Sequence, residues 1–186
     1  MVAAVPLADG VLLRPLTVDD AAALLDAYLR SREHLLPYEP VRPASFWTLA
    51  GQRARLETMV QQMAQGRQLA CVMLRDGGVL GCVTLNEIVL GPFRSASLGY
   101  WVAPTETGRG LATRAVAALC RVADQEVGLH RIQASTNLGN VASQRVLTKS
   151  GFERFGTARD YLHINGRWQD AHLYQRILND RPPSTG

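Results

Sequence analysis

Two glycines in the second half of the chain have the spacing of a phosphate-binding turn. Gly108 and Gly110 follow an apolar run at 97–102 and open a segment with helical spacing of apolar residues, 108–127. Glycine lets a backbone approach a ligand closely, and the first N–H groups of a helix have no partner inside it. The helix dipole adds to these donors, so the turn suits a diphosphate, although a plain helix start can carry the same glycines. No Gly-Lys-Ser/Thr follows, and Thr113 replaces the third glycine of a Rossmann fingerprint, which argues against both nucleotide motifs.

A polar pair lies further along the chain. Asn140 and Ser143 share one face with Leu147 in a short helix predicted at 140–149. The asparagine could cap this helix and the serine could be ordinary polar surface. Both could instead face a ligand, and the spacing leaves the two interpretations open.

Two glutamates are candidates for a general base, which needs a carboxylate close to the reacting proton. Glu87 interrupts the apolar run 83–90 and could equally be an exposed strand residue, whereas Glu39 lies in a proline-bounded loop and could bind an ammonium group instead. Glu106 is a poor candidate because a carboxylate beside the glycine turn would repel a diphosphate. Aromatic residues could line a groove for the acceptor, although core packing is their commoner use. They are Tyr38, Trp47, Phe93, Tyr161 and Trp168.

The elements that must position these residues are readable from the apolar patterns. Strands are predicted at 11–16, 69–74, 79–90, 97–102 and 130–136, helices at 17–29, 45–63, 108–127 and 140–149, and a closing hairpin at 152–178 around Asn165-Gly166. Gly151 fits a left-handed helix stop. Strands joined by tight turns pair antiparallel, and a strand–helix–strand passage implies parallel pairing. The expected fold is therefore α+β, a mixed sheet flanked by helices.

Length and composition fit one domain. The 186 residues are 47% apolar, and the domain is expected at 10–178 with flexible ends at 1–9 and 179–186. The net charge of +4 comes from scattered basic residues, so no direct nucleic-acid site is expected. The three cysteines lie in apolar segments without CxxC spacing, and the four histidines show no metal spacing. With no long apolar run and no secretory signal, a cytoplasmic protein without a disulfide, a metal site or a membrane span is expected.

The glycine turn and the Asn140/Ser143 helix, followed by Lys149-Ser150-Gly151-Phe152, resemble the GCN5-related N-acetyltransferase (GNAT) superfamily. The resemblance runs over nearly the whole chain, from Val11 to Ile177. Finer features resemble the RimJ/RimL type of ribosomal-protein N-acetyltransferase, and they lie at 34–42, 98–100, 130–134 and 160–170. The family implies acetyl-CoA as the cofactor and a mostly antiparallel sheet with a V-shaped split between the strands at 97–102 and 130–136.

The resemblance also implies a role for each part of the site. Pantetheine would pair with the backbone of the strand end, the glycine turn would bind the pyrophosphate, and the short helix would contact CoA. The expected cofactor-binding residues are Trp101, Val102, Thr107, Gly108, Arg109, Gly110, Leu111, Ala112, Asn137, Asn140 and Ser143. The sequence departs from the family twice: Thr105 replaces a glutamine or arginine, and Leu147 replaces a tyrosine that donates a proton in many relatives. Ser143 is therefore the expected partner of the departing thiolate.

These expectations lead to three candidate functions. The first is direct acetyl transfer to the N-terminal α-amine of a protein, by resemblance a ribosomal one; such an amine has a pKa near 8 and is easily deprotonated. Glu87 or Glu39 would be the base, and Tyr38, Glu39, Phe93 and Tyr161 would contact the acceptor. The second is acetylation of a small amine such as an antibiotic or polyamine, and the third is a non-catalytic acyl-CoA-binding module. Residues 30–44 contain two acidic residues and three arginines, which disfavours a polycation as the acceptor. The oligomeric state, monomer or homodimer, stays open.

Overall fold

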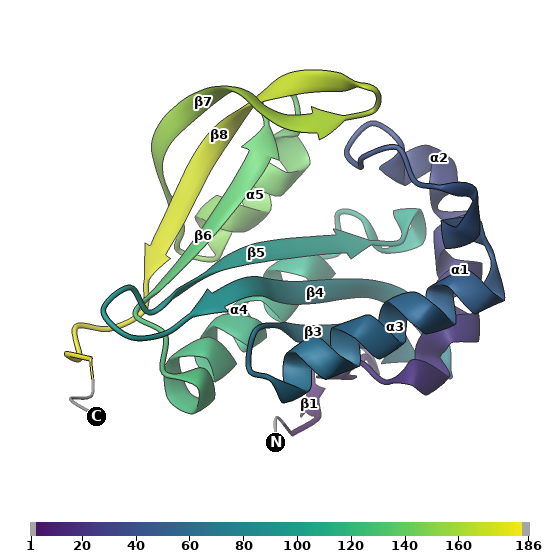
Figure 1. Ribbon diagram of the computed structural model, residues 1–186, viewed down its shortest axis with the longest axis horizontal. Helices are drawn as coiled ribbons and strands as arrows, with labels where there is room; N and C mark the ends of the chain where they lie inside the picture. Colours follow the sequence, from purple (N-terminus) through teal and green to yellow (C-terminus); the bar gives the residue numbers. More distant parts are fainter. Residues whose placement is uncertain (1–2, 184–186) are drawn as a thin grey trace.

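The computed structural model describes residues 3–183, which form one eight-stranded sheet with helices on both faces (Figure 1). The strands run in the order β1-β2-β3-β4-β5-β6-β8-β7. Their bounds are β1 Val5–Pro6, β2 Leu12–Pro15, β3 Leu69–Arg75, β4 Gly78–Val89, β5 Ser95–Val102, β6 Arg131–Asn137, β7 Glu153–Ile164 and β8 Arg167–Ile177. The α-helices are α1 Ala21–Arg30, α2 Arg32–Leu35, α3 Leu49–Ala64, α4 Leu111–Val122 and α5 Val141–Lys149. The predicted mixed sheet flanked by helices is confirmed.

The sheet is split between β5 and β6. Among the paired strands of residues 3–183, these two alone run parallel, and they pair only over Ser95–Ser97. Beyond Ser97, β5 continues along β4 as far as Val102, while β6 continues along β8 as far as Asn137. The two strands therefore diverge, as Figure 1 shows, and β5 keeps one edge without a strand partner over its last residues. This is the V-shaped split that the family resemblance implied.

Two apolar clusters hold the helices against opposite faces of the sheet. The buried faces of α4 and α5 pack with β4, β5 and β6, whereas α1 and α3 pack with β3 and β4 on the other side. Strand β3 contributes to both clusters because its side chains alternate: Cys71 and Met73 belong to the first, and Ala70 and Val72 to the second. A strand buried on both faces has a continuous apolar sequence, which explains why 69–74 lacks a polar side.

Several boundaries differ from the predicted ones for local reasons. Helix α3 begins at Leu49 instead of residue 45, because Ala44–Trp47 forms a 3-10 turn and the Thr48 hydroxyl caps the helix by accepting from the Gly51 N–H (3.1 Å). Helix α4 begins at Leu111, since Gly110 is left-handed and cannot continue it. The predicted left-handed stop at Gly151 is confirmed by its φ of 79°.

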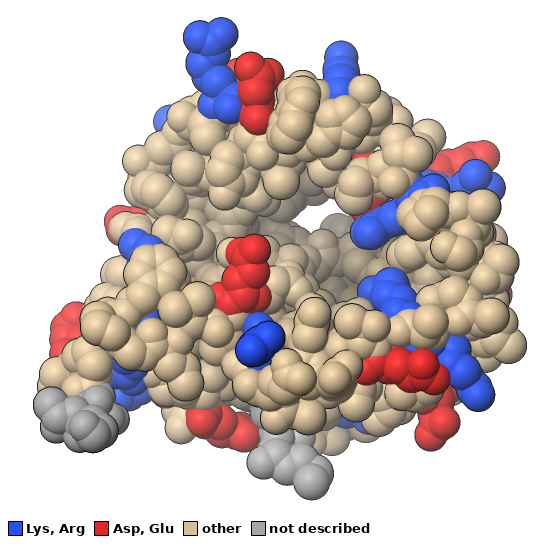
Figure 2. Space-filling model, viewed as in Figure 1, with Lys and Arg blue, Asp and Glu red and all other residues tan. Residues whose placement is uncertain are grey.

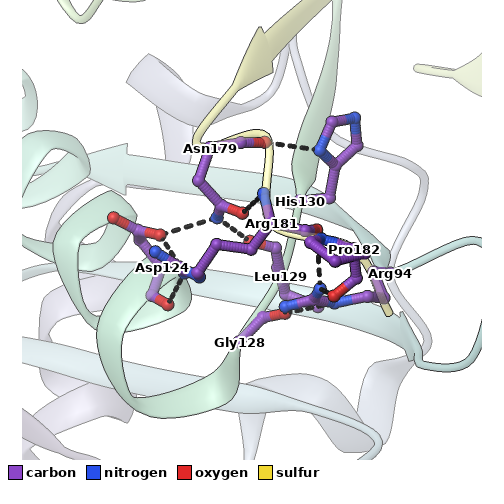
Figure 3. Close-up of polar contacts among 8 residues, drawn as sticks. All are labelled: Arg94, Asp124, Gly128, Leu129, His130, Asn179, Arg181 and Pro182. Carbon is purple, nitrogen blue, oxygen red and sulfur yellow. Dashed lines mark hydrogen bonds and ion pairs between the residues drawn. The ribbon is translucent and has the colours of Figure 1, made fainter. Parts of the chain in front are cut away.

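The chain ends make contacts that the sequence did not predict. Strand β1 lies inside the segment predicted to be flexible at 1–9 and pairs with β2. At the other end, the Asn179 amide donates to the carboxylate of Asp124 (2.7 Å) and to a backbone carbonyl, and the Arg94 guanidinium donates to the carbonyls of Arg181 and Pro182 (Figure 3). The Arg181 hydrogen bond chiefly holds the pKa of Asp124 below its usual value. The segment 179–182 is thus tied to the start of β5 and the end of α4; residues 184–186 lie outside the described part.

Candidate active site

The glycine turn presents free backbone donors at the mouth of the split. Gly108 and Gly110 both have a φ of 75°, and residues 107–110 are exposed. Arg114 is the first residue of α4 whose backbone N–H donates to a carbonyl of the preceding turn, that of Gly110 (3.1 Å). The N–H groups of the three helical residues before it therefore lack an acceptor within the helix and point out of its N-terminus. This geometry agrees with the predicted diphosphate site, whose ligand stays a prediction.

A buried carboxylate lies beneath this turn without making it anionic. Glu106 is 5% exposed. Its carboxylate accepts a hydrogen bond from the Arg75 guanidinium at 2.6 Å and lies 3.6 Å from the Arg109 guanidinium. The two arginines offset its charge, and the bond to Arg75 ties the turn to the end of β3. Glu106 is a structural anchor and not a base, in agreement with the sequence argument.

The turn allows a matched test of its role. Alanine at Gly108 would carry a Cβ at a φ that costs L-residues roughly 1–2 kcal/mol, so the backbone donors should shift. We expect Gly108→Ala to raise the KM for acetyl-CoA about tenfold, the change that about 1.4 kcal/mol produces. The control is Gly66→Ala after α3, where φ is 68° and, as at Gly108, an added Cβ meets nothing within 4 Å. Thermal melting should show similar destabilisation of both variants, whereas steady-state kinetics should show a raised KM for acetyl-CoA only in Gly108→Ala. If the KM of Gly108→Ala equals that of the wild type, the turn does not bind the cofactor.

The two predicted asparagines have structural partners. The Asn140 side-chain oxygen accepts from the Ser143 N–H (3.1 Å), so this residue caps α5, one of the two interpretations left open by the sequence. The Asn137 amide donates to the Gln169 side chain of β8 (3.0 Å). Contacts from either residue to CoA stay a prediction.

Ser143 is held by a tyrosine that the sequence analysis missed. The Tyr100 hydroxyl of β5 and the Ser143 hydroxyl of α5 are 2.8 Å apart, and this hydrogen bond joins the two walls of the split. Burial, opposed by the Ser143 hydrogen bond, raises the pKa of Tyr100 to about 12, so the phenol stays protonated at neutral pH. Leu147, one turn further along α5, is fully buried. Strand alternation could have identified Tyr100, because it must point to the face opposite Trp101 and hence toward α4 and α5.

A cavity of about 440 Å³ opens on the other face of the sheet, between α1, α3, the middle of β4 and the C-terminal half of β5. Its lining includes Tyr100 and Trp101, the strand end predicted to contact the cofactor. The Trp101 indole packs against the Tyr28 ring, with centroids 4.7 Å apart, and donates to its hydroxyl (3.1 Å). An acceptor in this cavity and a ligand along the free edge of β5 would therefore meet at the same strand.

The structure separates the two candidate bases. Glu39 is the carboxylate of the cavity lining; its side chain is 19% exposed and pairs with the Arg42 guanidinium (3.1 Å). Glu87 lies in a bulge of β4 with a φ of 53°, is exposed, accepts from the Ser97 hydroxyl (3.1 Å) and is not part of the lining. The geometry thus favours Glu39.

The predicted acceptor aromatics lie outside the cavity lining. Phe93 lies in the turn before β5, at the far end of that strand from the glycine turn, with the Arg131 guanidinium over its ring. Its placement in the acceptor groove finds no support, because residues before and after β5 lie at opposite ends of the strand. Tyr38, in the segment after α2, and Tyr161, in β7, are both exposed. Figure 2 shows an opening between the β7–β8 hairpin and the segment after α2. The Asn165 N–H, which donates to the Glu39 carbonyl (3.1 Å), links the two sides of this opening.

Other chemistries find little support in the described residues. Cys82 lines the cavity, but burial raises its pKa to about 12, so it is no nucleophile at neutral pH. Across 3–183, no group of three or more histidine, cysteine or acidic side chains could hold a metal ion. In the same part of the chain, no helix has the length and apolar character to cross a membrane.

Comparisons with known proteins give a consistent result. The acetyltransferase (GNAT) domain family matches residues 11–153. The ribosomal protein uS5-alanine N-acetyltransferase of Escherichia coli (strain K12) is 32% identical, covering 94% of this chain and 91% of its own. The crystal structure of ribosomal-protein-S5-alanine acetyltransferase from Vibrio fischeri has a TM-score of 0.93 at 30% identity, over 97% of this chain and 100% of its own. Mycobacterium smegmatis RimJ in complex with CoA-disulfide has a TM-score of 0.88 at 33% identity, over 94% and 86%.

Proposed function

Because this chain belongs to the GNAT acetyltransferase family, we propose that it transfers the acetyl group of acetyl-CoA to the N-terminal α-amine of a protein. The E. coli and V. fischeri relatives are named for an alanine of ribosomal protein S5, which supports a protein acceptor of that kind. The observation that carries the proposal is the meeting of the acceptor cavity with the free end of β5 at Tyr100 and Trp101.

The residues of the split fit acetyl-CoA. The backbone edge of β5 beyond Ser97 has no strand partner and can pair with the amides of pantetheine. The backbone N–H groups of 108–113, which include the exposed turn 108–110, can take the pyrophosphate, and the charge of Glu106 below them is offset by arginines. The M. smegmatis relative was solved with CoA-disulfide, which agrees with this assignment. Acetyl-CoA supplies an activated thioester carbonyl, and the protein must position an amine against it.

Two side chains have the required chemistry. Glu39 can hold the acceptor ammonium in the cavity and accept its proton, because it is the carboxylate of the lining. Ser143, oriented by Tyr100, can donate a hydrogen bond to the sulfur as charge develops there. We assign the transfer to a complex that contains both substrates, with direct attack by the amine.

The experiment that tests the function is CoA release from acetyl-CoA with a panel of acceptors. We expect turnover with peptides that carry a free N-terminus, including one with the N-terminal sequence of ribosomal protein S5, and little with polyamines or aminoglycosides. Turnover on the small amines alone would replace the protein acceptor by a small one. Tight acetyl-CoA binding without turnover on any acceptor would indicate a non-catalytic acyl-CoA-binding module.

A further inference from the structure

The acceptor cavity contains one positive charge that no acidic side chain compensates. Its charged lining residues are Glu39, Arg42 and Arg55. Glu39 and Arg42 pair with each other (3.1 Å). Arg55 has no carboxylate within 4 Å among residues 3–183; its Nε donates to the Gln52 side-chain oxygen (3.2 Å), and its Nη1 lies 3.1 Å from the Met59 sulfur. A cavity that offers both a carboxylate and an unpaired guanidinium can bind an acceptor that has both charges.

Arg55 is held in position before any ligand binds. Its guanidinium lies over the rings of Tyr28 and Phe46, at 5.5 and 5.4 Å from their centroids. Gln52, which receives its Nε–H, is fully buried and donates in turn to the Phe46 carbonyl (2.6 Å). These contacts order the side chain in the unbound protein, so binding an anion costs less conformational entropy than at a mobile surface arginine.

We propose that Arg55 binds a carboxylate of the acceptor, an aspartate or glutamate side chain among the first residues after the amine to be acetylated. The inference rests on the proposed function, because it places the amine beside Glu39 in the same cavity. A guanidinium matches a carboxylate through paired N–H···O bonds, and the pair gains strength in a partly dehydrated cavity. Basic side chains also border the opening on the side of α2 and α3, as Figure 2 shows, so an acidic N-terminal segment would meet an attractive field as it enters.

The test compares two C-terminally amidated peptides that differ only in glutamate or glutamine at the third residue. We expect the wild type to prefer the glutamate peptide about tenfold in kcat/KM, the lower range for a hydrogen bond to a charged group. Arg55→Gln should reduce this ratio to about one, whereas Arg55→Lys, which keeps the charge but not the fork, should keep part of it. The matched control is Arg53→Gln, an exposed arginine of the same helix outside the cavity lining, which should keep the full ratio.

Several outcomes overturn the proposal. One is an equal kcat/KM for both peptides in the wild type, and another is an unchanged glutamate-to-glutamine ratio in Arg55→Gln. A third is a preference that requires a free α-carboxylate, seen with unmodified amino acids but not with amidated peptides. Thermal melting shows whether Arg55→Gln is folded, and the lysine variant keeps the test decisive if it is not.

Peptide binding to the CoA-bound enzyme, followed by calorimetry, separates this inference from the proposed function. Tighter binding of the glutamate peptide without acetylation would refute the proposed acetylation of protein N-termini and keep the subsite. Acetylation of both peptides without any preference would refute the carboxylate subsite at Arg55 and keep the proposed function.

Discussion

Replacing Ser143 by alanine is expected to lower kcat by roughly 100-fold, within the range that a positioned proton donor contributes, with little change in the affinity for acetyl-CoA. The Ser143 hydroxyl is half-buried and is joined to Tyr100 across the split. The proposed function places the sulfur of the thioester beside it. A methyl group cannot stabilise charge on that sulfur, whereas the backbone donors of the glycine turn stay unchanged. Steady-state kinetics with both substrates varied, together with acetyl-CoA binding by calorimetry, measure the two effects separately.

Two further variants make this result specific. Tyr100→Phe keeps the ring but frees the serine hydroxyl, so we expect a smaller loss of kcat, about tenfold, as for one hydrogen bond of about 1.4 kcal/mol. Because the pKa of Tyr100 is raised to about 12, the wild-type kcat should show no loss from ionisation of this phenol up to pH 10. Ser150→Ala, at the end of the same helix, is the matched control, because the Ser150 hydroxyl has no hydrogen-bond partner among residues 3–183. An unchanged kcat in Ser143→Ala would exclude the serine as the donor to sulfur.

Removing the charge of Glu39 should have an effect of similar size on the acceptor side. We expect Glu39→Gln to lower kcat/KM for an N-terminal peptide by about 100-fold, because the amide keeps the shape but neither holds an ammonium nor accepts its proton. The KM for acetyl-CoA should change little, since the glycine turn lies elsewhere. Initial rates over a range of peptide concentrations at saturating acetyl-CoA provide the measurement.

The same measurement decides between the two glutamates. Glu87→Gln should change kcat/KM far less, because that side chain lies outside the cavity lining. Glu57→Gln, an exposed glutamate of α3, serves as the control for a lost surface charge. A large loss of kcat/KM in Glu87→Gln with a small loss in Glu39→Gln would indicate that Glu87 of β4, and not Glu39, is the base.

The fold was largely predictable because its signals are local. The glycine turn, the Asn-Gly hairpin and the alternating apolar runs each depend on residues a few positions apart, and the family resemblance added the split. The contact between Tyr100 and Ser143 depends on two residues 43 positions apart, whose approach is set by the packing of α5 against the sheet. Neither propensity nor periodicity contains that information.

The lack of support for Phe93 as an acceptor residue has a similar origin. Phe93 is close in sequence to β5, which suggested that it lies close to the site. It precedes β5, however, whereas the site lies at the other end of that strand. The proline-bounded loop made Glu39 a candidate, and the structure places this residue in the cavity lining, but its catalytic role stays a prediction. Its pairing with Arg42 and the free charge of Arg55 emerge only when the loop and α3 are folded together.

The C-terminal segment reinforces the point at which the two halves of the sheet join. Strands β5 and β6 are joined at the closed end of the split, where the Arg94 carbonyl accepts the N–H groups of His130 and Arg131. The guanidinium of the same residue donates to the carbonyls of Arg181 and Pro182 (Figure 3). The C-terminal segment thus braces the closed end of the split, at the opposite end of β5 from the glycine turn.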